Sequence, residues 1–80
     1  MIEVGFSKSF KRAFKKKVKD SPDLEDKFWK KLKIFIESPF DNSLQTHKLT
    51  GKLKDLWGFS VDYDLRVIFY FSKENRVVLV

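Results

Sequence analysis

Residues 46–71 read THKLTGKLKDLWGFSVDYDLRVIFYF, and this stretch decides the fold of the chain. Around the central segment Asp62-Tyr63-Asp64, apolar and polar side chains alternate. The apolar positions are Trp57, Phe59 and Val61 before that segment, and Leu65, Val67, Phe69 and Phe71 after it. A two-residue period is typical of a half-buried strand, and aspartate favours chain reversals. The stretch therefore predicts a β-hairpin, with strands over residues 56–62 and 65–71.

The segments on either side of the hairpin complete an α+β pattern. Residues 1–6 and 76–80 have the composition of short strands, and residues 40–55 read as a loop. Apolar side chains recur at helical spacing over residues 8–19, after a candidate N-cap at Ser7, and again from Pro22 to about Glu37. The predicted order is β-α-α-β-β-β: a helix hairpin packed on one face of a mainly antiparallel four-stranded sheet.

The composition limits the classes of function. Eighty residues form one domain, residues 1–80, and 42% of them are hydrophobic, which is enough for a compact core. The chain has no cysteine, so disulfides and thiol chemistry are excluded. A single histidine without cysteine argues against a structural zinc site, and no common cofactor motif is present. We therefore expect neither a metal nor a cofactor.

The net charge of +6 favours polyanionic partners. Seven basic side chains lie on the first predicted helix: Lys8, Lys11, Arg12, Lys15, Lys16, Lys17 and Lys19. They form either a solvated helix face or a surface that contacts phosphates. The N-terminus lacks the apolar core of a signal peptide, and no run approaches the roughly 20 apolar residues that span a bilayer. We expect a cytoplasmic protein that does not bind membranes.

Three polar residues of the central stretch are candidates for chemistry. His47 is either a proton acceptor or an ordinary loop histidine. Arg66 interrupts an apolar strand, so it is a cation mounted over the sheet, a solvent-facing residue, or a partner of a nearby aspartate. Asp64, together with Asp62, belongs either to a catalytic pair or to the turn. The residue pattern by itself leaves these alternatives open.

The same stretch resembles the RelE/ParE toxin superfamily of bacterial toxin–antitoxin systems, and within it the RelE/StbE-type or YafQ-like mRNA interferases. The matching pattern is H-x-L-x-G at residues 47–51, an aromatic residue at Trp57, and D-x-R-V-I-F at residues 64–69. The predicted order of strands and helices is also similar to that family. The resemblance extends over essentially all 80 residues.

The resemblance implies a toxin that cleaves mRNA on the ribosome without a metal ion and is neutralised by a cognate antitoxin protein. In such enzymes the ribose 2′-hydroxyl attacks the adjacent phosphorus and the 5′-oxygen leaves. By position, the resemblance assigns catalytic roles to His47, Asp64 and Arg66. It assigns contacts with the RNA backbone to Lys48, Lys52 and Lys54.

This sequence departs from the family pattern in three places. Ser60 stands near the position of a second histidine, and Leu65 replaces an aromatic residue. YafQ-like relatives continue after the last strand into a segment such as G-T-H-x-x-V-Y, whereas the last residue here is Val80. We therefore expect cleavage by the 80-residue form to be weakened or absent. A ParE-like gyrase inhibitor and a non-catalytic module that binds RNA or an antitoxin are the alternative hypotheses.

Overall fold

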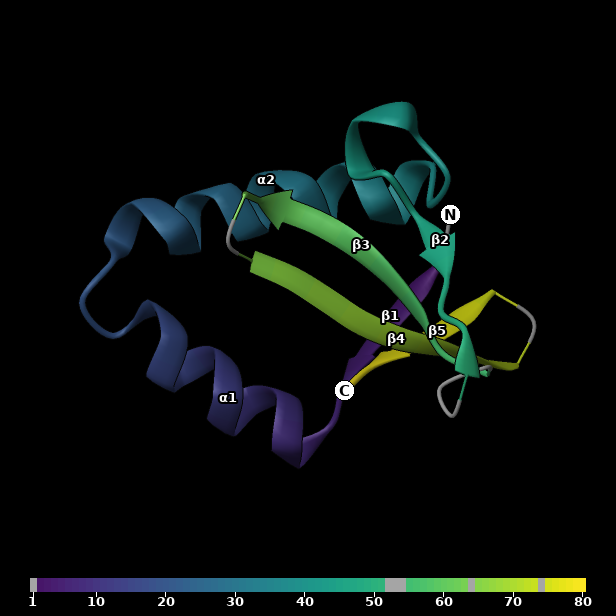
Figure 1. The fold of residues 1–80 in the computed structure, drawn as a ribbon, viewed down its shortest axis with the longest axis horizontal. Helices are drawn as coiled ribbons and strands as arrows, with labels where there is room; N and C mark the ends of the chain where they lie inside the picture. Colours follow the sequence, from purple (N-terminus) through teal and green to yellow (C-terminus); the bar gives the residue numbers. More distant parts are fainter. Residues whose placement is uncertain (1, 52–54, 64, 74) are drawn as a thin grey trace.

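The computed structural model describes residues 2–51, 55–63, 65–73 and 75–80. The chain forms an α+β domain of two helices and five strands (Figure 1). The elements are β1 (Glu3–Phe6), α1 (Lys8–Val18), α2 (Pro22–Glu37), the 3-10 helix η1 (Asn42–Leu44), β2 (His47–Lys48), β3 (Trp57–Asp62), β4 (Leu65–Lys73) and β5 (Arg76–Leu79). The predicted fold class is confirmed. Within the described residues, no helix has both the length and the apolar character needed to cross a membrane.

The strands form one mixed sheet in the order β1-β5-β4-β3-β2. β1 pairs with β5 in parallel, and the other neighbouring strands are antiparallel. The sheet has one strand more than the sequence predicted, because His47 and Lys48 pair with Gly58 and Trp57 at the edge of β3. A two-residue strand is too short to produce a periodic signal. The sequence therefore predicted a loop over residues 40–55, and β2 lies within that range.

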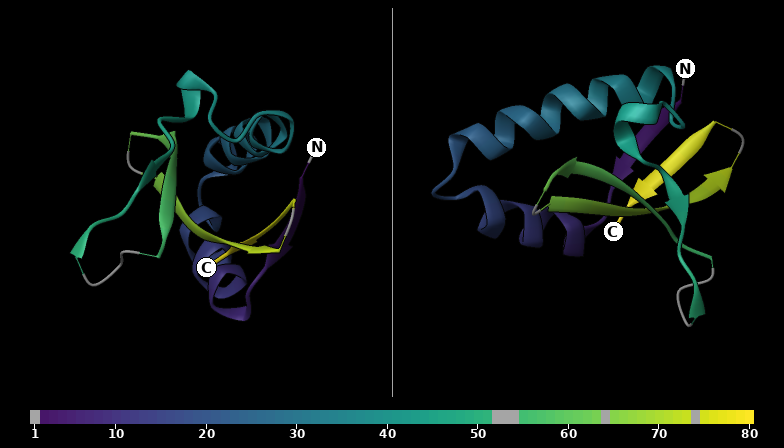
Figure 2. Two further views of the ribbon diagram at one scale, coloured as in Figure 1. Left: turned by 90° about the vertical axis from the view of Figure 1, so that its right-hand side faces the viewer. Right: turned by 45° about the horizontal axis from the view of Figure 1, so that its top comes forward.

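Helix α2 packs against one face of β3 and β4. It lies behind these strands in Figure 1, and α1 lies below β4. In the left view of Figure 2, α2 lies to one side of β3, and β1 and β5 lie on the opposite side of the molecule from β2. The predicted alternation is confirmed: Val67 and Phe69 are buried, while Arg66 and Tyr70 lie exposed on the face turned away from α2.

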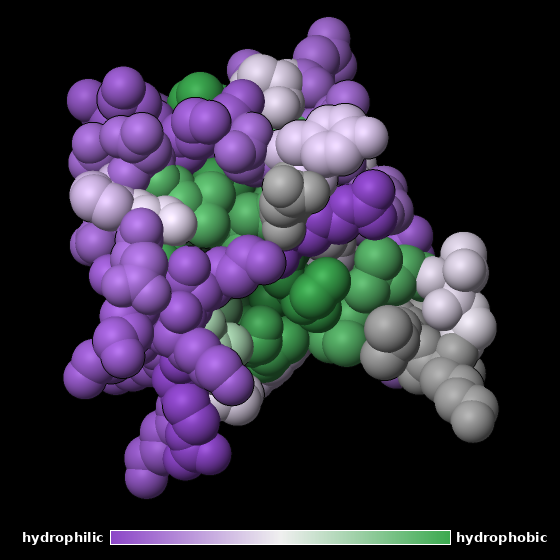
Figure 3. Space-filling view, turned by 60° about the vertical axis from the view of Figure 1, so that its left-hand side comes forward, coloured by the Kyte–Doolittle hydropathy of each residue, from purple (hydrophilic) through white to green (hydrophobic). Residues whose placement is uncertain are grey.

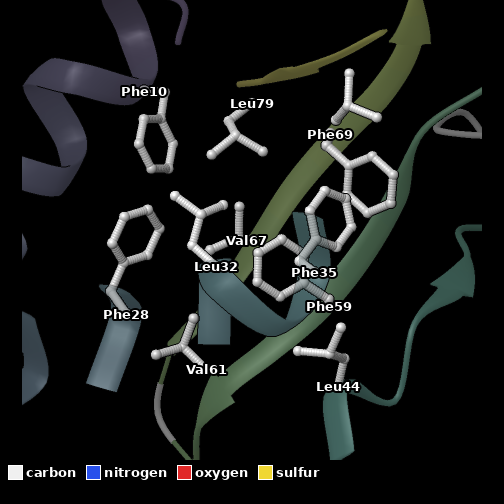
Figure 4. Packing of buried hydrophobic residues seen from close by; sticks show 11 residues of the cluster. Phe10, Phe28, Leu32, Phe35, Leu44, Phe59, Val61, Val67, Phe69 and Leu79 are labelled. Carbon is white, nitrogen blue, oxygen red and sulfur yellow. The ribbon is translucent and has the colours of Figure 1, made fainter. Parts of the chain in front are cut away.

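The core is a cluster of apolar side chains between α2 and the sheet (Figure 4). Phe35 of α2 is fully buried at its centre. Its ring stacks on Phe59, with centroids 4.5 Å apart, and meets Phe69 edge-on at 4.9 Å. Such aromatic contacts stabilise the fold beyond the apolar area that they bury. The predicted inner positions of the hairpin thus form the main contact surface for α2.

The two helices begin where the sequence predicted. The side chain of Ser7 accepts a hydrogen bond of 3.0 Å from the backbone N–H of Phe10, so Ser7 is the N-cap of α1. Pro22 is the first residue of α2, where its missing N–H leaves no helical hydrogen bond unmade. Ser21 occupies the N-cap position of α2, but its side chain makes no capping hydrogen bond.

Candidate functional site

Register places three polar side chains on the sheet face turned away from α2. His47 of β2 lies opposite Gly58 of β3, and Ser60 of β3 lies opposite Arg66 of β4. Directly opposed residues share a face, as do residues two apart on one strand. His47, Ser60 and Arg66 therefore occupy neighbouring strands on one face. The Cα atoms of His47 and Arg66 are two strand spacings apart across the sheet and two residues apart along the strands. Together these offsets make a distance of about 12 Å.

His47 is exposed at the edge of the sheet, and its ring is oriented by a backbone group. The Nδ1 atom of His47 lies 3.0 Å from the carbonyl oxygen of Gln45. A carbonyl oxygen only accepts hydrogen bonds, so Nδ1–H is the donor in this contact. In the neutral ring, the free Nε2 then carries the lone pair and can accept a proton. Gln45 has a left-handed conformation, with φ 52°, which turns the chain from η1 into β2.

Arg66 borders two hollows of different character. The larger is an open depression of about 950 Å³, which the Arg66 side chain shares with Lys27 and Lys31 of α2 and with polar residues of the hairpin tip. The smaller is an apolar groove of about 280 Å³ between α1 and β4, lined mainly by Phe10, Phe14 and hydrophobic residues of β4. Figure 3 shows apolar surface on this side of the molecule, bordered by hydrophilic side chains. An anion in the depression would meet three cationic side chains.

Lys27 and Lys31 line this depression although they were not among the site residues predicted from the sequence. They are four residues apart on α2, so they lie on one side of that helix, and this spacing was the available signal. Lys27 Nζ lies 3.1 Å from Asp62 Oδ2, and Lys31 donates a hydrogen bond of 3.2 Å to the carbonyl oxygen of Ser43. Both lysines are thus positioned at the rim of the depression by partners from other elements.

Asp62 acts as a partner for Lys27 at the end of β3. The backbone N–H of Tyr63 lowers the pKa of the Asp62 carboxyl below its ordinary value, and the Lys27 ammonium group lowers it further. A carboxylate held in the ionised form is a poor proton donor at neutral pH. Of the interpretations open for Asp62, the structure therefore favours turn and ion-pair chemistry over a catalytic pair.

The depressed pKa makes the contribution of Asp62 to stability dependent on pH. Because the folded-state pKa lies below the ordinary value, this contribution is present above the ordinary carboxyl pKa and is lost as pH falls through the lowered value. Asp62→Asn should therefore unfold at lower urea concentration than the wild type at pH 7, and the difference should shrink below about pH 4. Asp26→Asn, an exposed change on α2, is the control and should show no such trend.

Comparisons with known proteins identify the fold. No family model matches the sequence, and no curated protein matches it. Solved structures do match. A metal-bound toxin from Helicobacter pylori is 29% identical, with a TM-score of 0.78, covering 100% of this chain and 90% of that one. The YoeB/ParE toxin from Agrobacterium tumefaciens is 13% identical, with a TM-score of 0.79, and the match covers 99% of this chain and 93% of that one.

A third match is the YoeB–YefM toxin–antitoxin complex from Staphylococcus aureus, at 14% identity and a TM-score of 0.78, covering 100% of this chain and 92% of that one. This is the fold of the RelE/ParE toxin superfamily. The resemblance noted in the sequence is therefore confirmed at the level of the fold. The structural neighbours are toxins, and one of them was solved together with its antitoxin.

The structure gives positions for some of the predicted site residues, and the roles of all of them stay predictions. His47 and Arg66 share a sheet face, as described above. Lys48 follows His47 in β2, so its side chain is directed to the opposite face, next to Trp57. Asp64, Lys52 and Lys54 lie outside the described residues, and their roles stay predictions. Among the residues that the structure describes, no group of three or more potential ligands could hold a metal ion.

Proposed function

We propose that this protein is the toxin of a toxin–antitoxin pair and a metal-independent endoribonuclease that cleaves mRNA on the ribosome. The observation that carries the proposal is the shared sheet face of His47 and Arg66, on a fold whose neighbours are toxins. The sequence pattern around these two residues, H-x-L-x-G and R-V-I-F, adds to it. A cognate antitoxin is the proposed protein partner, by analogy with the Staphylococcus aureus complex.

The geometry suits a cleavage in which RNA supplies its own nucleophile. The Nε2 atom of His47 is oriented to take the proton of the ribose 2′-hydroxyl. The 2′-oxygen then forms a bond to the adjacent phosphorus while the bond to the 5′-oxygen breaks, and the leaving 5′-oxygen takes a proton from water. Arg66 offers a planar guanidinium for the negative charge that grows on the phosphoryl oxygens. Asp64 remains in the proposal as a third catalytic residue.

The proposal is tested by incubating the purified protein with ribosomes and a defined mRNA. The sequence predicts that scission by the 80-residue form is weakened or absent, and we expect any scission to continue in excess EDTA and to stop when the scissile nucleotide carries a 2′-O-methyl group. Scission that requires a divalent ion would contradict metal independence. Absence of scission, combined with inhibition of DNA supercoiling by gyrase, would favour the ParE-like alternative. Binding of mRNA without either activity would indicate a non-catalytic module.

A further inference from the structure

Three aromatic side chains from separate segments contact one another at the edge of the sheet where β2 pairs with β3. Phe40 follows α2, Trp57 begins β3, and Phe71 lies near the end of β4. Phe40 and Phe71 are 55% and 43% exposed, and Trp57 is partly buried. Isolated apolar residues are common on protein surfaces, but a contacting group of large rings often marks a binding site. We call this group the aromatic triad.

In the triad, the rings of Phe40 and Phe71 are nearly parallel, and the ring of Trp57 is nearly perpendicular to both. Phe40 and Phe71 lie within 20° of parallel, with centroids 6.4 Å apart. The Trp57 ring stands at 79° to Phe40 and at 83° to Phe71, with centroids 5.5 Å and 5.6 Å away. A flat ring inserted between two others needs a spacing of about 7 Å, twice the contact distance between carbon atoms. The centroid distance of 6.4 Å is shorter than this, so a base enters between Phe40 and Phe71 only if one of the two rings moves outward.

Lys48 beside the triad and the net charge of +6 favour a flat ligand that carries phosphate over a cationic ligand. Lys48 lies directly opposite Trp57 in the sheet. Lys73 follows Phe71 by two positions, but the pairing register of β4 with β5 shifts between these two residues. Two aspartates are also near in sequence. Asp41 follows Phe40, and its carboxylate keeps its negative charge because hydrogen bonds from the hydroxyl and the backbone of Ser43 lower its pKa. Asp55 is exposed in the turn before Trp57.

The triad is connected to the proposed cleavage face through β2. His47 is directed to the face that carries Arg66, and Lys48 is directed to the face that carries Trp57. The hydroxyl of Thr46 donates a hydrogen bond to the carbonyl oxygen of Pro39, which ties β2 to the segment that holds Phe40. A single RNA strand that crosses this short edge strand would meet His47 on one face and the triad on the other.

We infer that the aromatic triad stacks one unpaired base of the RNA, while Lys48 contacts the adjacent phosphate. The inference rests on the proposed function for the choice of RNA as the ligand. Stacking on exposed aromatic side chains is a general means of holding single strands, because every base has a flat π face. The triad would then hold the RNA strand beside the cleaved phosphate and favour unpaired nucleotides there.

The first test uses Trp57 as the reporter. Trp29→Phe removes the other tryptophan, which is half exposed on α2. The probe is a 2′-O-methyl hexaadenylate, which cannot be cleaved through its 2′-oxygen, and the comparison probe has the same backbone without bases. We expect the hexaadenylate to quench Trp57 fluorescence and the abasic oligomer to leave it unchanged. The hexaadenylate should also bind about 5- to 150-fold more tightly. Equal binding of the two oligomers would overturn the inference.

The second test compares two exposed aromatic side chains in the otherwise wild-type protein. Phe40→Ser removes one ring of the triad, and Trp29→Ser removes a ring of similar exposure on α2. Phe40→Ser should weaken binding of the hexaadenylate at least 5-fold, with little change in affinity for the abasic oligomer, whereas Trp29→Ser should preserve both affinities. Equal loss in both variants would contradict stacking at the triad.

Sedimentation of the RNA-free protein tests whether a second copy of this chain, and not RNA, covers the triad. A dimer that dissociates on Phe40→Ser would show that a second copy of this chain covers the triad, and would overturn the inference. Cleavage of mRNA is measured separately from these binding experiments. A protein that stacks bases but does not cleave mRNA would refute the proposed nuclease activity and leave the stacking site established.

Discussion

Replacing Arg66 with alanine is expected to reduce the rate of mRNA cleavage by about 100- to 1,000-fold. The backbone of Arg66 is held in β4 opposite Ser60, on the exposed face of the sheet, and its side chain borders the depression where a phosphate can lie. A donor positioned before the reaction stabilises the developing charge without reorganising at that moment. The alanine variant loses this stabilisation but removes no buried side chain, so its unfolding should change little.

The measurement is the single-turnover rate of mRNA cleavage. Ribosomes are in excess over the mRNA, and the toxin is in excess over the ribosome-bound mRNA. Arg12→Ala is the matched control, because it removes one positive charge from an exposed position of α1. Its cleavage rate should stay within a few-fold of the wild type. Arg66→Lys should recover part of the rate, since lysine keeps the charge but lacks the planar arrangement of donors. Full activity of Arg66→Ala would show that the catalytic assignment is wrong, and equal losses in both alanine variants would indicate only a general charge effect.

Replacing Phe35 with alanine is expected to cost about 3–5 kcal/mol of unfolding free energy. Phe35 is fully buried in α2 and packs between Phe59 and Phe69 of the hairpin, so its loss leaves a cavity at the contact between helix and sheet. An 80-residue domain has a total stability of only about 4–12 kcal/mol. The variant should therefore be partly or largely unfolded at 37 °C.

Urea denaturation followed by circular dichroism measures this cost. Phe40→Ala is the control, because it removes the same side chain from a position that is 55% exposed. We expect its unfolding free energy to change by less than about 1.5 kcal/mol, in proportion to the smaller area that it buries. Comparable losses in the two variants would contradict the placement of Phe35 at the centre of the core.

The hairpin and the helices were predictable because local periodicity determines them. Alternation around residues 62–64 sets which side chains of β3 and β4 face α2, and a shift of one residue would expose every buried one. Ser7 and Pro22 mark the helix starts by local effects. The Ser7 side chain caps the backbone N–H of Phe10, and the ring of Pro22 suits the first position of a helix. Phe71, predicted on the inner face, contacts Trp57 and Phe69 there but remains 43% exposed.

The fold class and the inner face of the sheet thus followed from local sequence patterns, and the same patterns named His47 and Arg66, whose catalytic roles stay predictions. Only the tertiary structure decided what lies next to them. It added the short strand β2, which separates His47 and Lys48 onto opposite faces, and it showed that Lys27 and Lys31 of α2 line the same open depression as Arg66. Periodicity and helix caps depend on residues that are close in sequence, so local patterns predict them. The contact of Lys27 with Asp62 joins residues 35 positions apart, so no local pattern predicts it. The aromatic triad likewise joins three segments that no local pattern connects.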